Sequence, residues 1–270
     1  MKILYIYPLW GSENIPLPQF FEKVKNAGFD GVEMVIPANK EYCRDLRVQL
    51  DKTGLKLIGH QHVIPGKETV DEYIVQMERQ LLHLASFTPL LINSHTGRDF
   101  FEFEDNCRII DVVNDISEKT KVPIVHETHR GRFSFSTYST RQYFKLYPEL
   151  KIAADFSHWC CVSESLLEDQ EEFLQEAIKR SEHIHARVGN SQSAQVNHPG
   201  APENQFALVR HLGWWKQIVE QRSKEDREQF TITTEFGPVP YMQTLPYTRQ
   251  PVASQWDLNV EIMNILKSIL

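Results

Sequence analysis

Apolar and polar residues alternate along the chain in two recurring patterns. Short runs of β-branched and apolar residues, such as Lys2–Tyr7 and Gly31–Val35, predict strands that are buried on both faces. Longer stretches with apolar residues every three or four positions, such as Leu17–Ala27 and Lys40–Thr53, predict amphipathic helices. The chain is therefore predicted to alternate strand and helix.

This alternation continues to the end of the chain. The remaining predicted strands are Lys56–Gly59, Leu90–Asn93, Val122–Val125, Lys151–Ala154, His183–Val188 and Phe230–Thr234. The remaining predicted helices are Thr69–Ser86, Glu104–Thr120, Thr137–Tyr147, Ser163–Arg180, Glu203–Arg222 and Gln255–Ile269. Eight units in 270 residues give about 34 residues per unit, the length of a strand and a helix joined by short loops. The sequence predicts the α/β class, with a single (β/α)8 TIM barrel domain over residues 1–270.

Composition and charge exclude several classes of protein. With 41% hydrophobic and 24% charged residues, the chain has the composition of a globular domain. The net charge of −7, without a basic block, argues against nucleic-acid binding. No apolar run approaches a membrane span, and the segment after the first strand has no GxGxxG turn for a nucleotide. We expect a cytoplasmic protein that binds neither nucleic acid nor a membrane. The sequence leaves open whether it forms a homo-oligomer.

Candidate ligands gather where the predicted strands end, which is where the active site of a (β/α)8 barrel is formed. The last four strands end in three carboxylates and an imidazole: Glu127, Asp155, His185 and Glu235. Each carboxylate alone is explained by capping of the next helix. Four such positions on consecutive strands are better explained by a cation, because inward-pointing carboxylates repel one another and lose hydration. One divalent ion, Mn²⁺, Mg²⁺, Co²⁺ or Zn²⁺, suits this mixed set of ligands.

Such a site supports proton transfer next to a carbonyl. A divalent ion that bridges a ketose carbonyl and its neighbouring hydroxyl acidifies the adjacent C–H and holds the enediolate. Glu127 and Glu235 are candidates for the acid/base pair, and His158 for hydrogen bonding to the oxyanion. Arg187, on the same strand face as His185, is a candidate to anchor a substrate oxygen.

These motifs resemble the xylose isomerase-like TIM barrel superfamily, which contains the sugar phosphate isomerase/epimerase family. Residues 28–33 look like the second strand of that family, and the resemblance extends over essentially the whole chain. Its epimerases hold a metal ion, for which Mn²⁺ is expected, with Glu, Asp, His and Glu on the last four strands. Those positions correspond here to Glu127, Asp155, His185 and Glu235. A substrate-contacting histidine lies three residues after the metal Asp, where this chain has His158.

Two segments depart from the epimerases. Their arginine lies further along the loop after the metal histidine, where this chain has residues 190–192. Their second acidic residue, shortly after the metal Glu, is replaced by the segment 129–132. Two arginines there, Arg130 and Arg132, indicate an anionic or highly hydroxylated substrate, unless they pair with neighbouring carboxylates.

Further histidines and one more carboxylate come from the other strands of the barrel. His60, His62 and His95 are candidates for substrate contacts, an additional acid/base or a second metal site, and His129 is a further candidate for substrate binding. Glu33 is a candidate for the pocket or for a salt bridge inside the barrel.

The predicted function is a metal-dependent isomerase or epimerase of a ketose or related sugar, the expected partner being that small molecule. The first alternative is a metal-dependent lyase on the same scaffold. It would remove water from an inosose, as an inosose dehydratase does, or an aglycone from a 3-keto-glycoside, with His129, His95 or His62 as the acid. An endonuclease IV-like enzyme is disfavoured by the acidic charge. A non-catalytic sugar-binding barrel is disfavoured because it needs no complete metal site.

Overall fold

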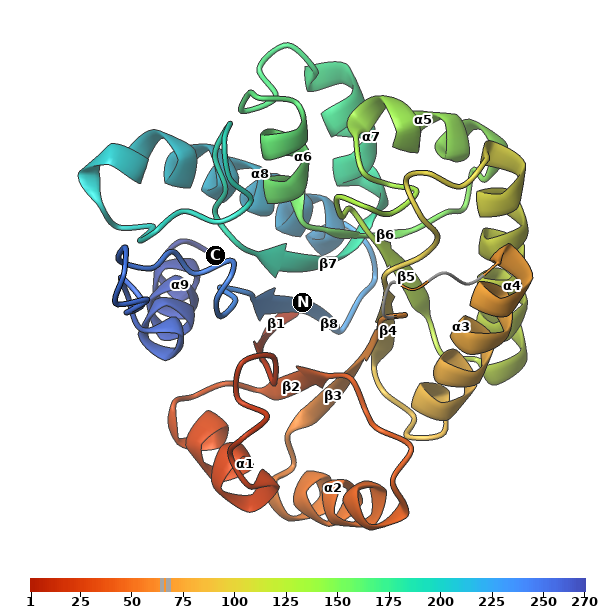
Figure 1. The fold of residues 1–270 in the computed structure, drawn as a ribbon, viewed down its shortest axis with the longest axis horizontal. Coiled ribbons are helices and arrows are strands. Elements are labelled where there is room, and N and C mark those ends of the chain that lie inside the picture. Colours follow the sequence, from red (N-terminus) through yellow and green to blue (C-terminus); the bar gives the residue numbers. More distant parts are fainter. Residues whose placement is uncertain (64–65, 67–68) are drawn as a thin grey trace.

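The computed structural model describes residues 1–63, 66 and 69–270. Eight parallel strands close into a barrel in chain order, with the last strand hydrogen-bonded to the first. Helices surround the barrel on its outside (Figure 1). The strands are β1 Lys2–Pro8, β2 Gly31–Met34, β3 Lys56–Gln61, β4 Leu91–Ser94, β5 Ile124–Glu127, β6 Ile152–Ala154, β7 Ser181–Ala186 and β8 Gln229–Thr234. The predicted (β/α)8 barrel is confirmed.

The helices begin and end with recognisable local chemistry. Thr69 and Glu72 form a reciprocal capping box at the start of α3, and Gly54 ends α2 in the left-handed region with φ 71°. The helices are α1 Leu17–Asn26, α2 Lys40–Thr53, α3 Val70–Ala85, α4 Phe103–Thr120, α5 Thr137–Leu146, α6 Phe156–Val162, α7 Glu171–Arg180, α8 Gln205–Ser223 and α9 Gln255–Ile269, with a 3₁₀ turn at Pro202–Asn204.

The sixth strand–helix unit differs from the prediction. The expected helix Ser163–Arg180 is wrong in its first part, because α6 starts directly after β6 and α7 begins only at Glu171. The Asp155 side chain accepts a hydrogen bond from the Ser157 backbone N–H, 3.2 Å away, and so starts α6. The predicted strand His183–Val188 is displaced, since β7 spans Ser181–Ala186. The early start of α6 brings His158 beside the strand ends.

Two apolar cores hold the fold together. A large core fills the space between the strands and the helices and includes Trp214 and Trp215, each 1% exposed. A small core inside the barrel consists of Leu4, Ile6, Ile58, Leu91, Val125 and Ala153. Nearer the carboxyl ends of the strands, the barrel interior becomes polar, with Glu33, Asn93 and His185 fully or almost fully buried. This polar layer lies directly below the barrel mouth.

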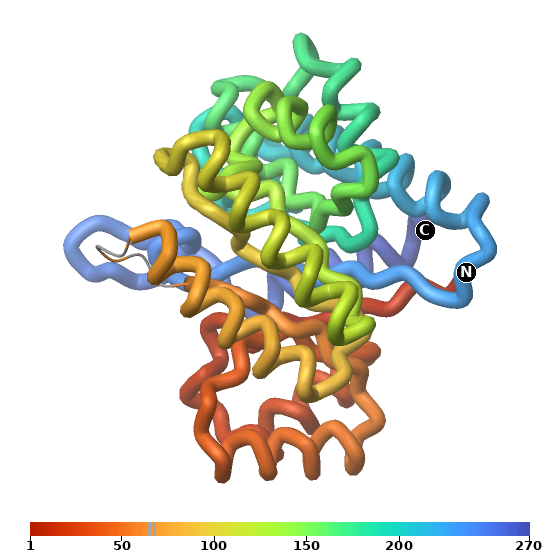
Figure 2. The backbone as a smooth tube through the Cα atoms, turned by 90° about the vertical axis from the view of Figure 1, so that its right-hand side faces the viewer, coloured from red at the N-terminus to blue at the C-terminus, as the bar shows by residue number. Residues whose placement is uncertain are grey.

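A long loop, residues 235–254, projects from the molecule on the side away from the N-terminus (Figure 2). It follows β8, so it belongs to the carboxyl-end face of the barrel. Gly237 in this loop allows a close approach of Trp10, because a Cβ there would lie 2.2 Å from the Trp10 ring. Among the described residues, no helix has the length and apolarity needed to cross a membrane.

Candidate metal centre and substrate pocket

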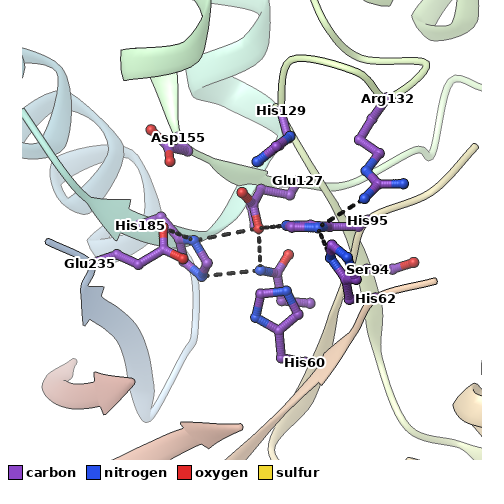
Figure 3. A network of polar contacts seen from close by, with 12 residues as sticks. His60, His62, Ser94, His95, Glu127, His129, Arg132, Asp155, His185 and Glu235 are labelled. Atoms are coloured by element: carbon purple, nitrogen blue, oxygen red, sulfur yellow. Dashed lines mark hydrogen bonds and ion pairs between the residues drawn. The ribbon is translucent and has the colours of Figure 1, made fainter. Parts of the chain in front are cut away.

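The four predicted metal ligands come together at the mouth of the barrel. Glu127 is the last residue of β5, Asp155 follows β6, His185 lies in β7 and Glu235 follows β8. One ligand atom from each lies within 4.8 Å of every other, and all four residues are buried. Figure 3 shows the side chains of Glu127, His185 and Glu235 turned toward one another. The spacing is that of a single-ion site, and we call these four residues the carboxylate cage.

Unsatisfied atoms in the cage show that these residues fit a cation. His185 Nδ1 lies 2.6 Å from Glu235 Oε2 and 3.4 Å from Glu127 Oε2. Neither approach has hydrogen-bond geometry, and within the described residues Nδ1 and Glu127 Oε1 are both buried without a partner. Orphaned buried polar atoms are rare and need an explanation. A divalent ion that accepts these lone pairs supplies one.

Two cationic side chains balance part of the charge in the cage. Arg187 is 1% exposed, contacts Asp155 Oδ2, and donates to Glu235 Oε2 across 3.0 Å. Burial opposes the charge on His185, but without a cation the carboxylates of Glu235, Glu33 and Glu127 raise its pKa well above the usual value; a bound cation would replace the proton on Nδ1. The Arg187 guanidinium thus lies between two cage carboxylates, and its expected contact with a substrate oxygen stays a prediction.

Burial and like charge act together on Asp155. Burial raises the pKa of this carboxyl to about 6, Arg187 opposes the shift, and the nearby carboxylates of Glu235 and Glu127 add to it. An isolated carboxylate in such surroundings tends to take up a proton. A cation in the cage removes that tendency and keeps Asp155 available as a ligand.

Three histidines from β3 and β4 form the opposite side of the mouth, and we call His60, His62 and His95 the histidine wall. His62 Nδ1 lies 2.9 Å from His95 Nδ1, and His95 Nε2 lies 2.9 Å from Glu127 Oε2 (Figure 3). A carboxylate only accepts, so His95 Nε2 carries the hydrogen and its Nδ1 accepts from His62. Burial lowers the pKa of His62 and of His95 to about 3. Both imidazoles are therefore neutral near pH 7.

His60 behaves differently from its neighbours. Its Nδ1 lies 3.4 Å from Glu33 Oε1. Burial opposes protonation, but the Glu33 carboxylate, helped by Glu127 and Glu235, raises the pKa of His60 above the usual value. His60 is the member of the histidine wall that holds a positive charge most readily.

A cavity of about 520 Å³ opens between the cage and the histidine wall. It is lined by Pro8, Leu9, Trp10, Glu13, Glu33, Met34, Val35, His60, His62, Gln80, His95, His129, Arg187, Glu235 and Tyr241. Of the carboxylate cage, Glu235 reaches the cavity surface. Trp10 meets Tyr241 edge to face, with ring centroids 5.1 Å apart, and the two rings form an aromatic rim. Sequence reasoning missed Trp10, although it follows β1 closely and the strand-end rule applies to it.

Other predicted contacts are placed less directly. His129 lines the cavity, whereas Arg130 stacks over the Tyr241 ring at 5.0 Å. Arg132 is 3% exposed behind His95, with Nη2 3.5 Å from His95 Nδ1. His158 is fully buried, and its Nε2 lies 3.1 Å from Arg187 Nη2. Substrate contact by Arg130 and His158 stays a prediction.

Comparison with known proteins agrees with this architecture. The family model for the xylose isomerase-like TIM barrel matches residues 21–222. The chain belongs to the xylose isomerase-like TIM barrel family. The resemblance drawn from the sequence is thereby confirmed at the level of the family. Among curated proteins, no sequence matches significantly.

Several solved structures of this family's fold are similar over nearly their whole length. The probable 3-DHS dehydratase involved in petrobactin synthesis from Bacillus anthracis is 18% identical, with 100% of each chain covered and a TM-score of 0.63. A D-allulose 3-epimerase from Methylomonas sp., in complex with D-allulose, is 12% identical, with 100% of this chain and 98% of that chain covered and a TM-score of 0.68. Endonuclease IV from Thermus thermophilus is 12% identical, with 98% of each chain covered and a TM-score of 0.61. At these identities the likeness shows the fold alone.

Proposed function

We propose that this xylose isomerase-like protein is a metal-dependent isomerase or epimerase that moves a proton next to the carbonyl of a ketose or related sugar. One observation carries the proposal: four ligand atoms from consecutive strands lie within 4.8 Å of one another beside a cavity of about 520 Å³. A cavity of this size accommodates a sugar-sized molecule.

Glu127, Asp155, His185 and Glu235 would hold the ion. A divalent cation bound there supplies Lewis-acid polarisation of a carbonyl and lowers the pKa of the adjacent C–H. Mn²⁺ suits three carboxylates and one imidazole, and Mg²⁺, Co²⁺ and Zn²⁺ are the other candidates. The buried atoms His185 Nδ1 and Glu127 Oε1, which have no hydrogen-bond partner in the described part of the chain, support this assignment.

Residues around the cavity would transfer the proton, hydrogen-bond the substrate and exclude water. Glu235 is the cage carboxylate on the cavity surface, so it is placed to accept or return the substrate proton. Glu127 is 1% exposed and its Oε2 accepts hydrogen bonds from His95 and Asn93, which suits a ligand. As the second member of the acid/base pair it would use Oε1, which has no partner within the described residues. His62, His95 and His129 line the cavity. His62 donates to His95 through Nδ1, so its Nε2 would accept a hydrogen bond from a sugar hydroxyl, whereas both His95 nitrogens already contact Glu127 and His62. Trp10 and Tyr241 would exclude water at the rim.

A lyase acting on a similar substrate is the second candidate, and His60 is the observation that favours it. Elimination needs an acid that protonates the leaving group after the proton beside the carbonyl is removed. The neutral imidazoles of His62 and His95 are poor acids near pH 7, because burial lowers their pKa to about 3. His60, whose pKa is raised mainly by Glu33 against the effect of burial, lines the cavity and is the better acid.

Nuclear magnetic resonance in D₂O distinguishes these reactions. The protein is incubated with Mn²⁺ and a pool of ketoses, inososes and 3-keto-glycosides, and the ion is removed by chelation before spectra are recorded. Deuterium appearing beside a carbonyl, with the carbon skeleton and substituents intact, supports the isomerase or epimerase. Loss of water or of an aglycone overturns it in favour of the lyase.

A further inference from the structure

Glu33 is a buried carboxylate that the carboxylate cage does not include. It lies on β2, which β1 and β8 separate from β7, and is 2% exposed. Its layer borders the apolar interior formed by side chains such as Ile6 and Ile58. Burying an ionised carboxylate costs several kcal/mol unless hydrogen bonds and opposite charge compensate. The neighbours of Glu33 therefore indicate what it does.

Those neighbours converge on His185. His185 Nε2 lies 3.0 Å from Glu33 Oε1 and 3.1 Å from Oε2. Thr233, which is the register partner of His185 on β8, donates its hydroxyl to Glu33 Oε2. Asn93 donates its side-chain amide to Glu33 Oε1 across 3.2 Å and to Glu127 Oε2 across 2.6 Å. Glu33 is thus held from both sides of the barrel.

The contact fixes which nitrogen of His185 carries a hydrogen. Asn93 Nδ2 also lies 3.0 Å from His185 Nε2, but its two hydrogens are donated to Glu33 and Glu127. A carboxylate has no hydrogen to donate, so His185 Nε2 donates to Glu33. When a cation is bound, Nδ1 then keeps its lone pair, and Nδ1 is the atom 2.6 Å from Glu235 Oε2 inside the cage. One imidazole ring therefore connects Glu33 on one side to the cage on the other.

We propose that Glu33 is a positioning residue that fixes the ring orientation and tautomer of His185, so that Nδ1 faces the cation. This inference rests on the proposed metal-dependent function. Carboxylates that accept from the far N–H of a metal-binding histidine orient the ring and increase the basicity of the ligand. Glu33 lines the cavity but is not one of the four cage residues, and the role proposed here acts through its contact with His185.

If Glu33 served only to stabilise the fold, replacing it would have a different effect from the loss of a residue that orients His185. His183 Nε2 also lies 3.4 Å from Glu33 Oε2, and His60 lies at the same distance from Oε1, so Glu33 contributes to the fold as well. Loss of a fold contact lowers the melting temperature but leaves the affinity of a folded protein for a cation unchanged. Loss of a ligand-orienting contact lowers that affinity.

The test is a Mn²⁺ titration followed by electron paramagnetic resonance, with thermal melting of the metal-free protein alongside. Glu33→Gln is expected to weaken Mn²⁺ binding by roughly 10- to 100-fold. Glu182→Gln is the matched control, because Glu182 is a largely buried carboxylate on the same strand as His185 and pairs with Arg222 and Arg227. The control is expected to lower the melting temperature while leaving Mn²⁺ affinity unchanged.

Thr233→Val provides a second variant of nearly the same shape if Glu33→Gln does not fold. It removes one hydrogen bond to Glu33 and is expected to weaken Mn²⁺ binding by about 3- to 10-fold. Unchanged Mn²⁺ affinity in folded Glu33→Gln, or in Thr233→Val when that is the variant tested, overturns the role of Glu33. Failure of the unsubstituted protein to bind any of Mn²⁺, Mg²⁺, Co²⁺ and Zn²⁺ overturns the proposed metal-dependent function instead.

Discussion

The β5–β8 side of the barrel mouth carries three buried carboxylates, whereas the β3–β4 side carries three imidazoles. On the first side, carboxylates raise the pKa of His185 in spite of its burial. On the second side, burial lowers the pKa of His62 and His95 to about 3 and leaves these two uncharged, whereas Glu33 raises the pKa of His60 against the effect of burial. Under the proposed function, the anionic side would hold the cation, and His62 with its partner His95, which we call the neutral side, would face a polar, uncharged ligand.

Glu235→Gln tests the anionic side and has the largest expected effect. The amide keeps the shape of the side chain but does not accept a proton, so turnover is expected to fall by roughly 10²- to 10⁴-fold. The measurement is the rate of deuterium uptake beside the carbonyl in D₂O, with circular dichroism to check the fold. An unchanged rate removes Glu235 from the proton transfer.

Arg187→Met tests how the cage is stabilised without an ion. Removing the guanidinium leaves Asp155 and Glu235 buried with less compensation, so the free energy of unfolding in chelator is expected to fall by about 3–5 kcal/mol. Added Mn²⁺ is expected to restore part of that loss, and denaturant unfolding measures both quantities.

Arg222→Met is the control for Arg187, because Arg222 is 2% exposed and pairs with Glu182 away from the cage. Its destabilisation is expected to be the same with and without Mn²⁺. If Mn²⁺ also restored the free energy of unfolding of the Arg222 variant, this would contradict the view that the ion stabilises the protein by binding in the carboxylate cage.

His62→Gln tests the neutral side. Gln retains hydrogen-bonding groups but changes their position, so KM is expected to rise by about 3- to 10-fold, with Mn²⁺ affinity unchanged. Steady-state kinetics and a Mn²⁺ titration measure the two effects separately. A large loss of Mn²⁺ affinity would place His62 among the metal ligands. It would contradict the assignment of cation binding to the carboxylate cage alone.

His211 in α8 provides a reference outside the mouth. It is fully buried, Nδ1 lies 2.9 Å from the Ala207 carbonyl oxygen, and burial lowers its pKa to about 4. An unfolded histidine titrates near pH 6.5, so between about pH 6.5 and 4 the unfolded chain binds a proton that the folded chain does not. The free energy of unfolding is therefore expected to decrease as pH falls through this range, by up to about 1.4 kcal/mol per pH unit.

Denaturant unfolding at a series of pH values, for the unsubstituted protein and for His211→Gln, measures this effect. A shallower dependence on pH is expected in the variant. Identical slopes would show that His211 does not contribute.

The cage was predictable because its members share one simple rule. Parallel strands of a closed barrel end on one face, so Glu127, Asp155, His185 and Glu235 had to approach one another once the strands were placed. The rule also covers Trp10, which follows β1 but carries no ionisable group that would mark it as a candidate site residue. The arrangement of strand ends was thus accessible from the hydrophobic pattern alone.

Contacts across the barrel were not predictable in this way. Glu33 reaches His185 from β2, and Arg187 contacts two cage carboxylates while it lines the cavity, because side-chain directions depend on barrel closure and packing. The start of α6 was missed because Asp155 serves as both a helix cap and a cage residue. A pattern of apolar positions carries no information on the directions of these polar side chains or on the double role of Asp155.

The most direct test of the account is metal binding by the cage itself. Isothermal titration with Mn²⁺, supported by metal analysis after dialysis, is carried out on the unsubstituted protein and on Asp155→Asn, a change expected to leave the barrel folded. We predict one Mn²⁺ per chain for the unsubstituted protein and at least about 100-fold weaker binding for the variant. Absence of binding to the unsubstituted protein, or equal binding by both, would contradict the assignment of the four residues as a metal centre.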